Sequence, residues 1–136
     1  METPLTQYVK SGGPPPGLKE YEESGGYDAV RKALKEMTPS GIIALVKSSG
    51  LTGRGGAGFP TGLKWSFVPE ETAVMGYNYL VTNADEMEPG TYKDRYLLEG
   101  NPHQLIAGMI ISSYAIRAQK SYIFIRWAYK KAESVL

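Results

Sequence analysis

Cysteine is absent from this 136-residue chain, and histidine occurs only once. The sequence therefore offers no disulfide, no thiolate metal site and no metal site built on several histidines. No stretch approaches the roughly 18 consecutive apolar residues that a membrane-spanning helix needs. The first 17 residues also lack the apolar centre of a secretory signal. We therefore expect neither direct membrane insertion nor export through such a signal.

An excess of charge of one sign is also missing. The chain has 15 basic and 14 acidic residues, for a net charge of +1. A nucleic-acid-binding domain usually carries a strong basic patch, so we expect no nucleic-acid partner. Apolar residues make up 42% of the chain, which is enough to form a globular core.

Proline and glycine are concentrated near the N-terminus, in residues 1–26. This composition predicts an extended arm that lies on the surface of a larger partner. The remainder, residues 27–136, reads as part of one domain. Its last ten residues have helical spacing without a glycine or proline stop, so we expect the chain to be a fragment of a longer protein.

Within the domain, apolar spacing predicts alternating helices and strands. Thr38 and Pro39 form an N-cap and first-turn pair at the start of one helix, which Gly50 ends. The other predicted elements are a helix at 27–37, a strand at 79–82, a helix at 102–119 and a strand at 121–127. The strand–helix–strand order indicates a parallel sheet, because parallel strands need a crossover between them. We predict an α/β fold with a Rossmann-like parallel sheet flanked by helices.

The stretch GRGGAGFPTGLKW, residues 53–65, is unusually rich in glycine. Glycine allows the backbone to approach a ligand closely, and Arg54 and Lys64 add positive charge, so a phosphate is the natural guest. Gly53, Gly55 and Gly58 match the pattern G-x-G-x-x-G. A helix precedes this loop, however, whereas a strand precedes the dinucleotide-binding fingerprint. A purely structural loop with tight turns remains the alternative.

A second stretch, NADEMEPGTYKDR at residues 83–95, follows the predicted strand 79–82. Ligands of open α/β sheets bind at the carboxyl ends of strands, where carboxylates accept hydrogen bonds from hydroxyl or ring N–H groups. Asp85, Glu86 and Glu88 are candidates for this role. The alternative is a solvated acidic turn paired with Lys93 and Arg95.

Aromatic rings flank the glycine-rich loop. Phe59 and Phe67 are placed to stack on a nicotinamide or an adenine, although ordinary core packing would also account for Phe67. His103 is expected to lie at the start of a helix and to take no part in catalysis.

The two motifs together resemble the flavin-bearing 51 kDa family of respiratory complex I, the F subunits of NADH-quinone oxidoreductase. The segments GGYDAVRKALKEMTP and EGNPHQLIAGMIISSYAI are similar to it as well. Related NADH-linked subunits of hydrogenases and formate dehydrogenases share the motifs. The resemblance implies a subunit that takes hydride from NADH onto FMN and passes electrons to iron–sulfur clusters toward quinone.

The resemblance also implies roles for individual residues. The acidic Glu88 matches the position that binds the adenosine ribose of NADH and disfavours a 2′-phosphate. Phe59 and Phe67 match rings that stack around adenine. Flavin contacts are implied for Asn83, Asp85 and Glu86. Binding of FMN and the nucleotide is implied for the loop residues Gly53, Arg54, Gly55, Gly56 and Lys64, with Gly58 in the same loop.

The family protein is longer than this chain. The resemblance places its 4Fe–4S cluster ligands and further FMN contacts in sequence beyond residue 136, so the isolated chain is expected to be inactive. The implied partners are NADH and peripheral-arm subunits of complex I, especially the 24 kDa-type 2Fe–2S subunit. The implied location is the cytoplasmic face of the cell membrane, or the matrix side in mitochondria. Two alternatives stay open: the same module in an NAD-linked hydrogenase or formate dehydrogenase, and a noncatalytic nucleotide-binding fragment.

Overall fold

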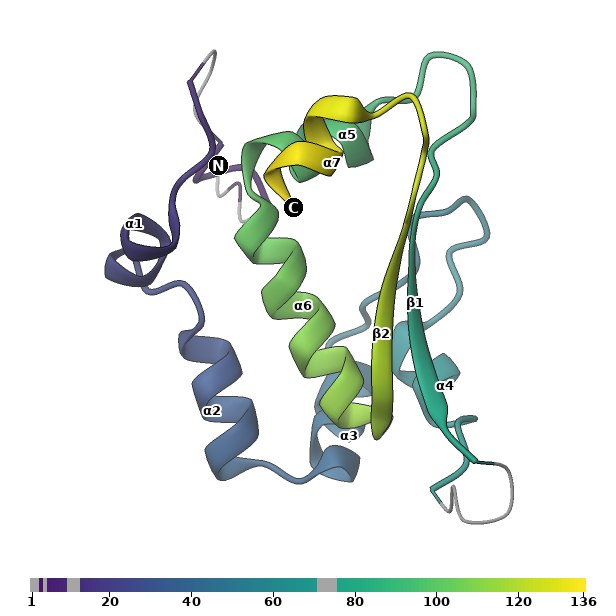
Figure 1. Ribbon diagram of the computed structural model, residues 1–136. Coiled ribbons are helices and arrows are strands. Elements are labelled where there is room, and N and C mark those ends of the chain that lie inside the picture. Colours follow the sequence, from purple (N-terminus) through teal and green to yellow (C-terminus); the bar gives the residue numbers. More distant parts are fainter. Residues whose placement is uncertain (1–2, 4, 10–12, 71–75) are drawn as a thin grey trace.

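The structure is a computed structural model that describes residues 3, 5–9, 13–70 and 76–136. Helices precede, separate and follow the two strands of the described chain (Figure 1). The elements are α1 (Leu18–Glu23), α2 (Asp28–Glu36), α3 (Pro39–Ser48), α4 (Thr61–Trp65), β1 (Asn78–Ala84), α5 (Lys93–Gly100), α6 (Pro102–Ala115), β2 (Ala118–Ile125) and α7 (Lys130–Val135).

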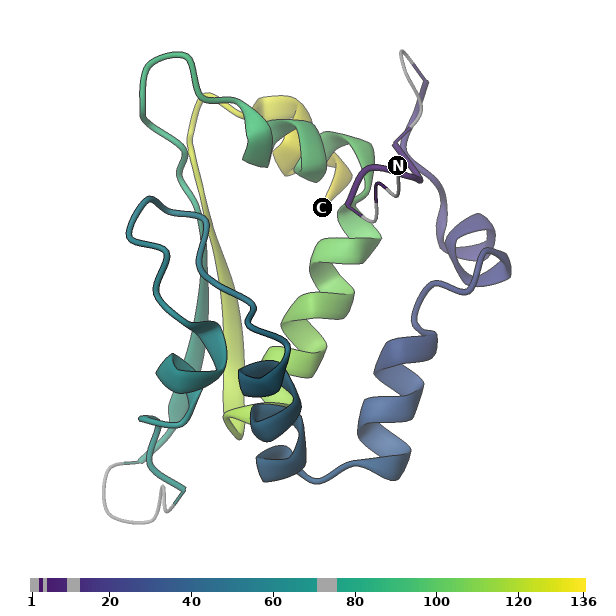
Figure 2. The same ribbon diagram turned by 180° about the vertical axis from the view of Figure 1, so that it is seen from behind.

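The sheet consists of β1 and β2, which pair in parallel. Val81 lies beside Tyr122 and Ala84 beside Ile125 in the register. The connection between the strands contains α5 and α6, and α6 packs along the sheet (Figures 1 and 2). The predicted α/β fold with a parallel sheet is therefore confirmed, because a crossover helix brings the two strands side by side in the same direction.

The crossover helix α6 begins as predicted and ends earlier. The side chain of Asn101 accepts a hydrogen bond from the Gln104 amide, and Pro102 follows in the first turn. The predicted end at residue 119 is wrong, because Arg117 has a left-handed backbone with φ +54°. That conformation stops the helix, and β2 starts at Ala118.

The arm predicted over residues 1–26 is not extended throughout. Leu18–Glu23 form α1, and the buried Tyr21 of this helix stacks on His103 with ring centroids 5.4 Å apart. The Tyr27 hydroxyl lies 3.0 Å from Nδ1 of His103. This aromatic cluster fastens the N-terminal segment to the start of α6, a tertiary contact that composition alone does not reveal.

Helices α2 and α3 follow the predicted pattern. The Thr38 side chain accepts a hydrogen bond from the Gly41 amide and caps α3. The buried Ala33, Ile42 and Ala115 form one core cluster that joins α2, α3 and α6. A second cluster, around Ala84, Leu98, Tyr129 and Ala132, joins the sheet to α5 and α7.

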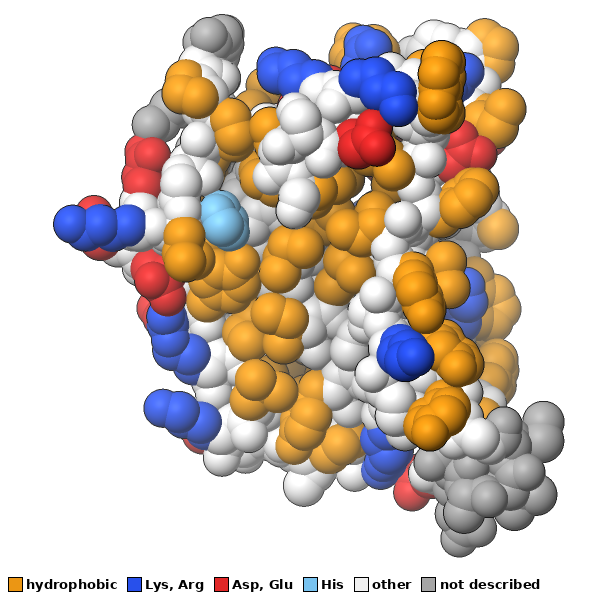
Figure 3. Space-filling view, in the orientation of Figure 1, with side chains coloured by type: hydrophobic (Ala, Val, Ile, Leu, Met, Phe, Trp, Pro, Cys, Tyr) orange, Lys and Arg blue, Asp and Glu red, His pale blue; other side chains and the backbone are white. Residues whose placement is uncertain are grey.

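Hydrophobic side chains are visible on the surface over α6 and along the strands (Figure 3). On the sheet, Tyr79 and Val81 of β1 and Tyr122 and Phe124 of β2 are about half exposed or more. Parallel sheets in complete domains are normally covered on both faces. Among the described helices, none is long and apolar enough to cross a membrane.

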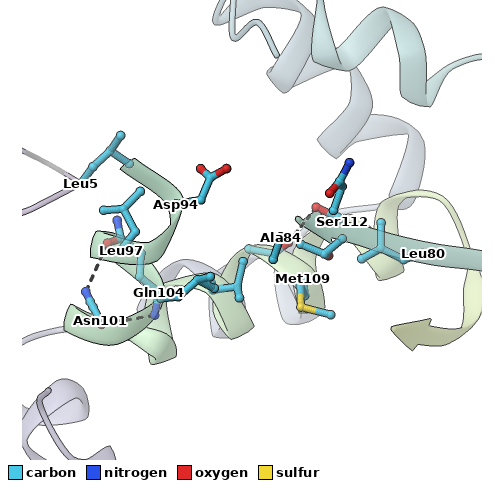
Figure 4. A pocket seen from close by; sticks show the side chains of 14 residues that line it. Leu5, Leu80, Ala84, Asp94, Leu97, Asn101, Gln104, Met109 and Ser112 are labelled. Atoms are coloured by element: carbon cyan, nitrogen blue, oxygen red, sulfur yellow. Dashed lines mark hydrogen bonds between the residues drawn. The ribbon is translucent and has the colours of Figure 1, made fainter. Parts of the chain in front are cut away.

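An apolar cavity of about 330 Å³ lies between β1, α5 and α6 (Figure 4). Leu80, Leu97, Met109 and Gly108 contribute to its lining. Gly108 stands inside α6, and a Cβ atom added to it would meet no heavy atom within 4 Å. The glycine is therefore not required by packing among the described residues.

Gly108→Ala is expected to stabilise the chain by roughly 0.5–1 kcal/mol, because alanine loses less backbone entropy than glycine in a helix interior. Urea denaturation would measure the change. Gly62→Ala is the matched control with the opposite sign, because its Cβ would lie 2.5 Å from the Lys47 amide nitrogen. Equal destabilisation by both changes would contradict the described packing of α6.

Candidate functional site

The glycine-rich loop is closed at its base by backbone hydrogen bonds. The Gly53 amide donates to the Phe59 carbonyl and the Thr61 amide donates to the Leu51 carbonyl, both at 2.9 Å. Thr52 and Pro60 form an isolated antiparallel bridge between these bonds. The loop is therefore held as a unit between α3 and α4, which agrees with the prediction that a helix and not a strand precedes it.

Different physical requirements account for the glycines at different positions of this loop. Gly56 has φ +110° and Gly58 has φ +61°, so their backbones favour glycine. Gly55 does not have a left-handed backbone, and a Cβ added there would meet no heavy atom within 4 Å. Neither backbone strain nor crowding explains glycine at position 55, which lines a cavity.

The acidic segment after β1 is built from two turns. The Asp85 amide donates to Oδ1 of Asn83 at 2.9 Å, which turns the chain directly after the strand. The Thr91 amide then donates to the Glu88 carbonyl at 3.1 Å across Pro89 and Gly90, and Gly90 has φ +79°. Proline and glycine at these central positions are typical of a type II turn.

Glu86 is the anchor of this segment. Its side chain is only 1% exposed. Its carboxylate accepts hydrogen bonds from the amides of Asp94, at 3.1 and 3.2 Å, and Arg95, at 3.4 Å. It thereby satisfies N–H groups that the first turn of α5 leaves without helical partners. Lys93 Nζ adds an ion pair at 3.4 Å.

Two residues after β2 also donate hydrogen bonds to Glu86. Arg126 donates from Nη1 to the Glu86 carbonyl, and the buried Tyr129 hydroxyl donates to Glu86 Oε2 at 3.3 Å. The acidic turn, α5 and the segment after β2 are thus joined at one carboxylate. The flavin contact predicted for Glu86 would have to compete with these partners.

Burial tends to raise the pKa of Glu86, but hydrogen bonds from the Asp94 and Arg95 amides and the ammonium of Lys93 outweigh it and lower the pKa from the ordinary 4.5. At a pH between the lowered pKa of Glu86 in the folded chain and its ordinary pKa in the unfolded chain, the unfolded chain binds more protons than the folded chain. Acidification through this range therefore lowers the free energy of unfolding. We expect the urea midpoint to fall as the pH drops through and below 4.5, and Glu86→Gln to reduce this loss. An unchanged midpoint from pH 6 to pH 3 would contradict it.

The glycine-rich loop and the acidic turn lie beside each other near the carboxyl end of β1 (Figures 1 and 2). They line one open cavity of about 600 Å³. The predicted site residues in its lining are Arg54, Gly55, Gly56, Asn83, Asp85, Glu86 and Glu88. Thr91, Lys93 and Asp94 also line it, although they were not predicted as site residues.

Other predicted site residues do not line this cavity. Gly53 closes the base of the loop, and Gly58 has a left-handed backbone within it. Lys64 lies on α4 and is exposed. The rings of Phe59 and Phe67 lie 6.4 Å apart and tilted by 54°, and both are well exposed. The two rings are adjacent to each other and outside the cavity lining.

Charge in the cavity is divided between paired and unpaired groups. Lys93 forms ion pairs with Glu86 at 3.4 Å and with Asp94 at 3.0 Å. Arg54, Asp85 and Glu88 have no side-chain ion pair among the described residues. The cavity thus offers an unpaired guanidinium and glycine amides on one wall, and unpaired carboxylates on the other. This arrangement suits a ligand with an anionic group and hydroxyl groups.

Among the residues that the structure describes, no group of three or more His, Cys, Asp or Glu side chains could hold a metal ion. The sequence model of one protein family, the Nuo51 FMN-binding domain, matches residues 46–136. The chain belongs to this family. The matched residues include both the glycine-rich loop and the acidic turn.

Curated relatives agree with the family match. The chain is 52% identical to the F subunit of NADH-quinone oxidoreductase from Buchnera aphidicola (subsp. Acyrthosiphon pisum), over 98% of this chain and 30% of the relative. It is 51% identical to the corresponding protein of Escherichia coli (strain K12), over 95% of this chain and 29% of the relative. The chain therefore spans about 30% of the length of the relatives it matches.

A solved structure shares the fold. An NAD+-reducing NiFe hydrogenase superposes on 89% of this chain and 21% of its own chain, with a TM-score of 0.73 and 40% sequence identity. The Rossmann-like arrangement predicted from the sequence is consistent with this neighbour. Chains similar to this one thus occur both in NADH-quinone oxidoreductases and in a hydrogenase.

Proposed function

We propose that the chain is the FMN- and NADH-binding part of an NADH dehydrogenase subunit. The observation that carries this proposal is the cavity of about 600 Å³ that the glycine-rich loop and the acidic turn line together. The membership in the Nuo51 FMN-binding family supports FMN as its ligand. NADH as the second ligand is supported by the names of the relatives.

The residues of the cavity fit a flavin mononucleotide. Gly55 leaves open space that a side chain would fill, which allows a planar group to approach the backbone. The unpaired Arg54 guanidinium suits the phosphate, and the Asp85 carboxylate suits hydroxyl or ring N–H groups. Glu86 has a different role in this proposal, because its oxygens already hold α5, the acidic turn and Tyr129 together.

Bound FMN would supply the redox chemistry, accepting a hydride from NADH and releasing electrons singly. The contribution of this chain is then to bind and orient. The anchored acidic turn keeps Asp85 and Glu88 at fixed positions on one wall, while the closed loop keeps Arg54 on the other. None of the lining residues is required as a general acid or base in this proposal.

Glu88→Gln is expected to improve NADPH binding roughly fivefold, because two unit charges about 4 Å apart repel by about 1 kcal/mol in water. Glu88 is exposed and has no ion-pair partner among the described residues, so its full charge can act on a ligand. The dissociation constants of NADH and NADPH would be measured by fluorescence titration. Glu36→Gln on α2 is the matched control. Unchanged selectivity would remove Glu88 from the proposed nucleotide site.

The longer protein would complete the electron path. In the proposal, electrons pass to a 4Fe–4S cluster held by sequence outside this chain, and then to a 2Fe–2S subunit of the 24 kDa type. The assembly would lie on the cytoplasmic face of the membrane, or on the matrix side in mitochondria. The hydrogenase neighbour favours one second candidate, in which the same module serves an NAD-linked hydrogenase.

FMN fluorescence quenching tests the binding proposal directly. Adding the chain to FMN should quench flavin fluorescence to saturation, and Arg54→Gln should weaken the affinity roughly tenfold by removing a charge-assisted hydrogen bond. Lys32→Gln on α2, which removes an exposed charge outside the cavity lining, is the control. No quenching at high micromolar concentrations would favour a chain that does not bind FMN by itself.

A further inference from the structure

A second cavity adjoins the first on the acidic turn. It has a volume of about 600 Å³ and is lined by the turn at 87–92 together with Arg95, Arg126 and Tyr129. Glu88 and Thr91 line both cavities. The turn therefore forms a wall between two separate hollows, and the proposed function uses only one of them.

Two guanidinium side chains line this second cavity. The Cζ atoms of Arg95 and Arg126 lie 5.6 and 5.9 Å from the centroid of the same Tyr129 ring. Tyr129 is buried and donates to Glu86, so the ring is a fixed support for both groups. Stacking on an aromatic ring holds a guanidinium in place and leaves its edge free for hydrogen bonds.

Most donors of these two groups have no protein acceptor in the described part of the chain. Arg126 donates one bond from Nη1, to the Glu86 carbonyl, and takes part in no described ion pair. Among the described residues, the Arg95 side chain makes no hydrogen bond and no ion pair, and its guanidinium lies over the Tyr129 ring. Each guanidinium carries five N–H donors in a fork that matches the oxygens of a phosphate or carboxylate.

The charge balance differs between the two cavities. In the second cavity the two arginines face a single lining carboxylate, Glu88, which is exposed and is shared with the first cavity. The first cavity contains four carboxylates against Arg54 and Lys93. An oxyanion is therefore favoured in the second cavity by its local charge.

We propose that Arg95 and Arg126 form an oxyanion site, distinct from the FMN cavity, that takes a phosphate group. The group is either free phosphate or the phosphate of a phosphorylated small molecule. The site does not depend on FMN binding, because neither arginine lines the first cavity.

The test is a titration of the isotopically labelled chain with inorganic phosphate, followed by amide and arginine side-chain NMR shifts at constant ionic strength. Saturable shifts at Arg95, Arg126 and Thr91 support the site. Phenyl phosphate, titrated separately, distinguishes the sources: tighter binding indicates a phosphorylated molecule, and equal binding indicates the free anion. Shifts that sodium chloride reproduces at the same ionic strength would overturn the proposal.

Arg95→Gln should weaken phosphate binding about tenfold, because it removes one charged fork of donors. Arg126→Lys provides a second variant that keeps the charge and loses the fork, and it should weaken binding several-fold. Lys32→Gln is the charge-matched control and should bind phosphate like the parent chain. Circular dichroism would confirm that each variant is folded. Parent-like phosphate affinity in either folded arginine variant would overturn the assignment.

Discussion

Gly56→Val is expected to lower FMN affinity roughly 100-fold or more, which removes flavin binding at micromolar concentrations. Gly56 has φ +110°, a backbone conformation that a β-branched residue does not adopt without strain, and it lines the cavity. The valine side chain would also occupy the space through which a ligand approaches the loop. Quenching of FMN fluorescence gives the affinity.

Two further variants separate strain from obstruction. Gly50→Val places valine at another left-handed glycine, φ +67°, with no heavy atom within 4 Å of the added Cβ and outside the cavity lining. It should bind FMN nearly as well as the parent chain. Gly55→Val introduces no left-handed strain but adds a bulky side chain to the cavity lining, so it should reduce binding strongly. Normal flavin affinity in Gly55→Val and Gly56→Val would refute the role of the loop.

Glu86→Ala should destabilise the chain by about 3 kcal/mol, because each buried group left without its partner costs roughly 1–3 kcal/mol. The change removes the acceptor of the Asp94 and Arg95 amides at the start of α5, and it leaves the buried Tyr129 hydroxyl without the Oε2 atom of Glu86. The ion pair with Lys93 adds little, because the lysine side chain is 47% exposed. Urea denaturation with the slope held constant measures the loss.

Asp85→Ala is the natural control for this experiment. It removes the neighbouring carboxylate, which has no described hydrogen bond or ion pair through its side chain, so stability should change by less than about 0.5 kcal/mol. Glu86→Gln should lie between the two, because its amide oxygen still accepts a bond from the α5 amides. A Glu86→Ala chain as stable as Asp85→Ala would contradict the anchoring role of Glu86.

Much of the fold was predictable because local signals and tertiary structure agree. Thr38 and Asn101 cap their helices as their side-chain chemistry indicates, and the apolar runs around Val81 and Ile123 form the paired strands. Helix α1 and the left-handed Arg117 were not predictable from local pattern. The first depends on the stacking of Tyr21 on His103, and the second on where β2 must begin.

The candidate site was predictable to a similar extent. The glycine content of the loop and the carboxylates of the acidic turn predicted the two walls of the cavity. Both features can be read directly from the residue types in the sequence. The anchoring of Glu86 was missed because its partners Arg126 and Tyr129 are 40 and 43 residues away along the chain. A sequence pattern reports which groups are charged, but only the folded structure shows which charges are already paired.

Amide chemical shifts of the labelled chain during FMN titration test the central claim most directly. We predict that saturating FMN shifts residues in both the 53–58 loop and the 83–88 turn, with one common dissociation constant. Shifts confined to one of these segments, or centred on a different part of the molecule, would contradict a shared flavin cavity.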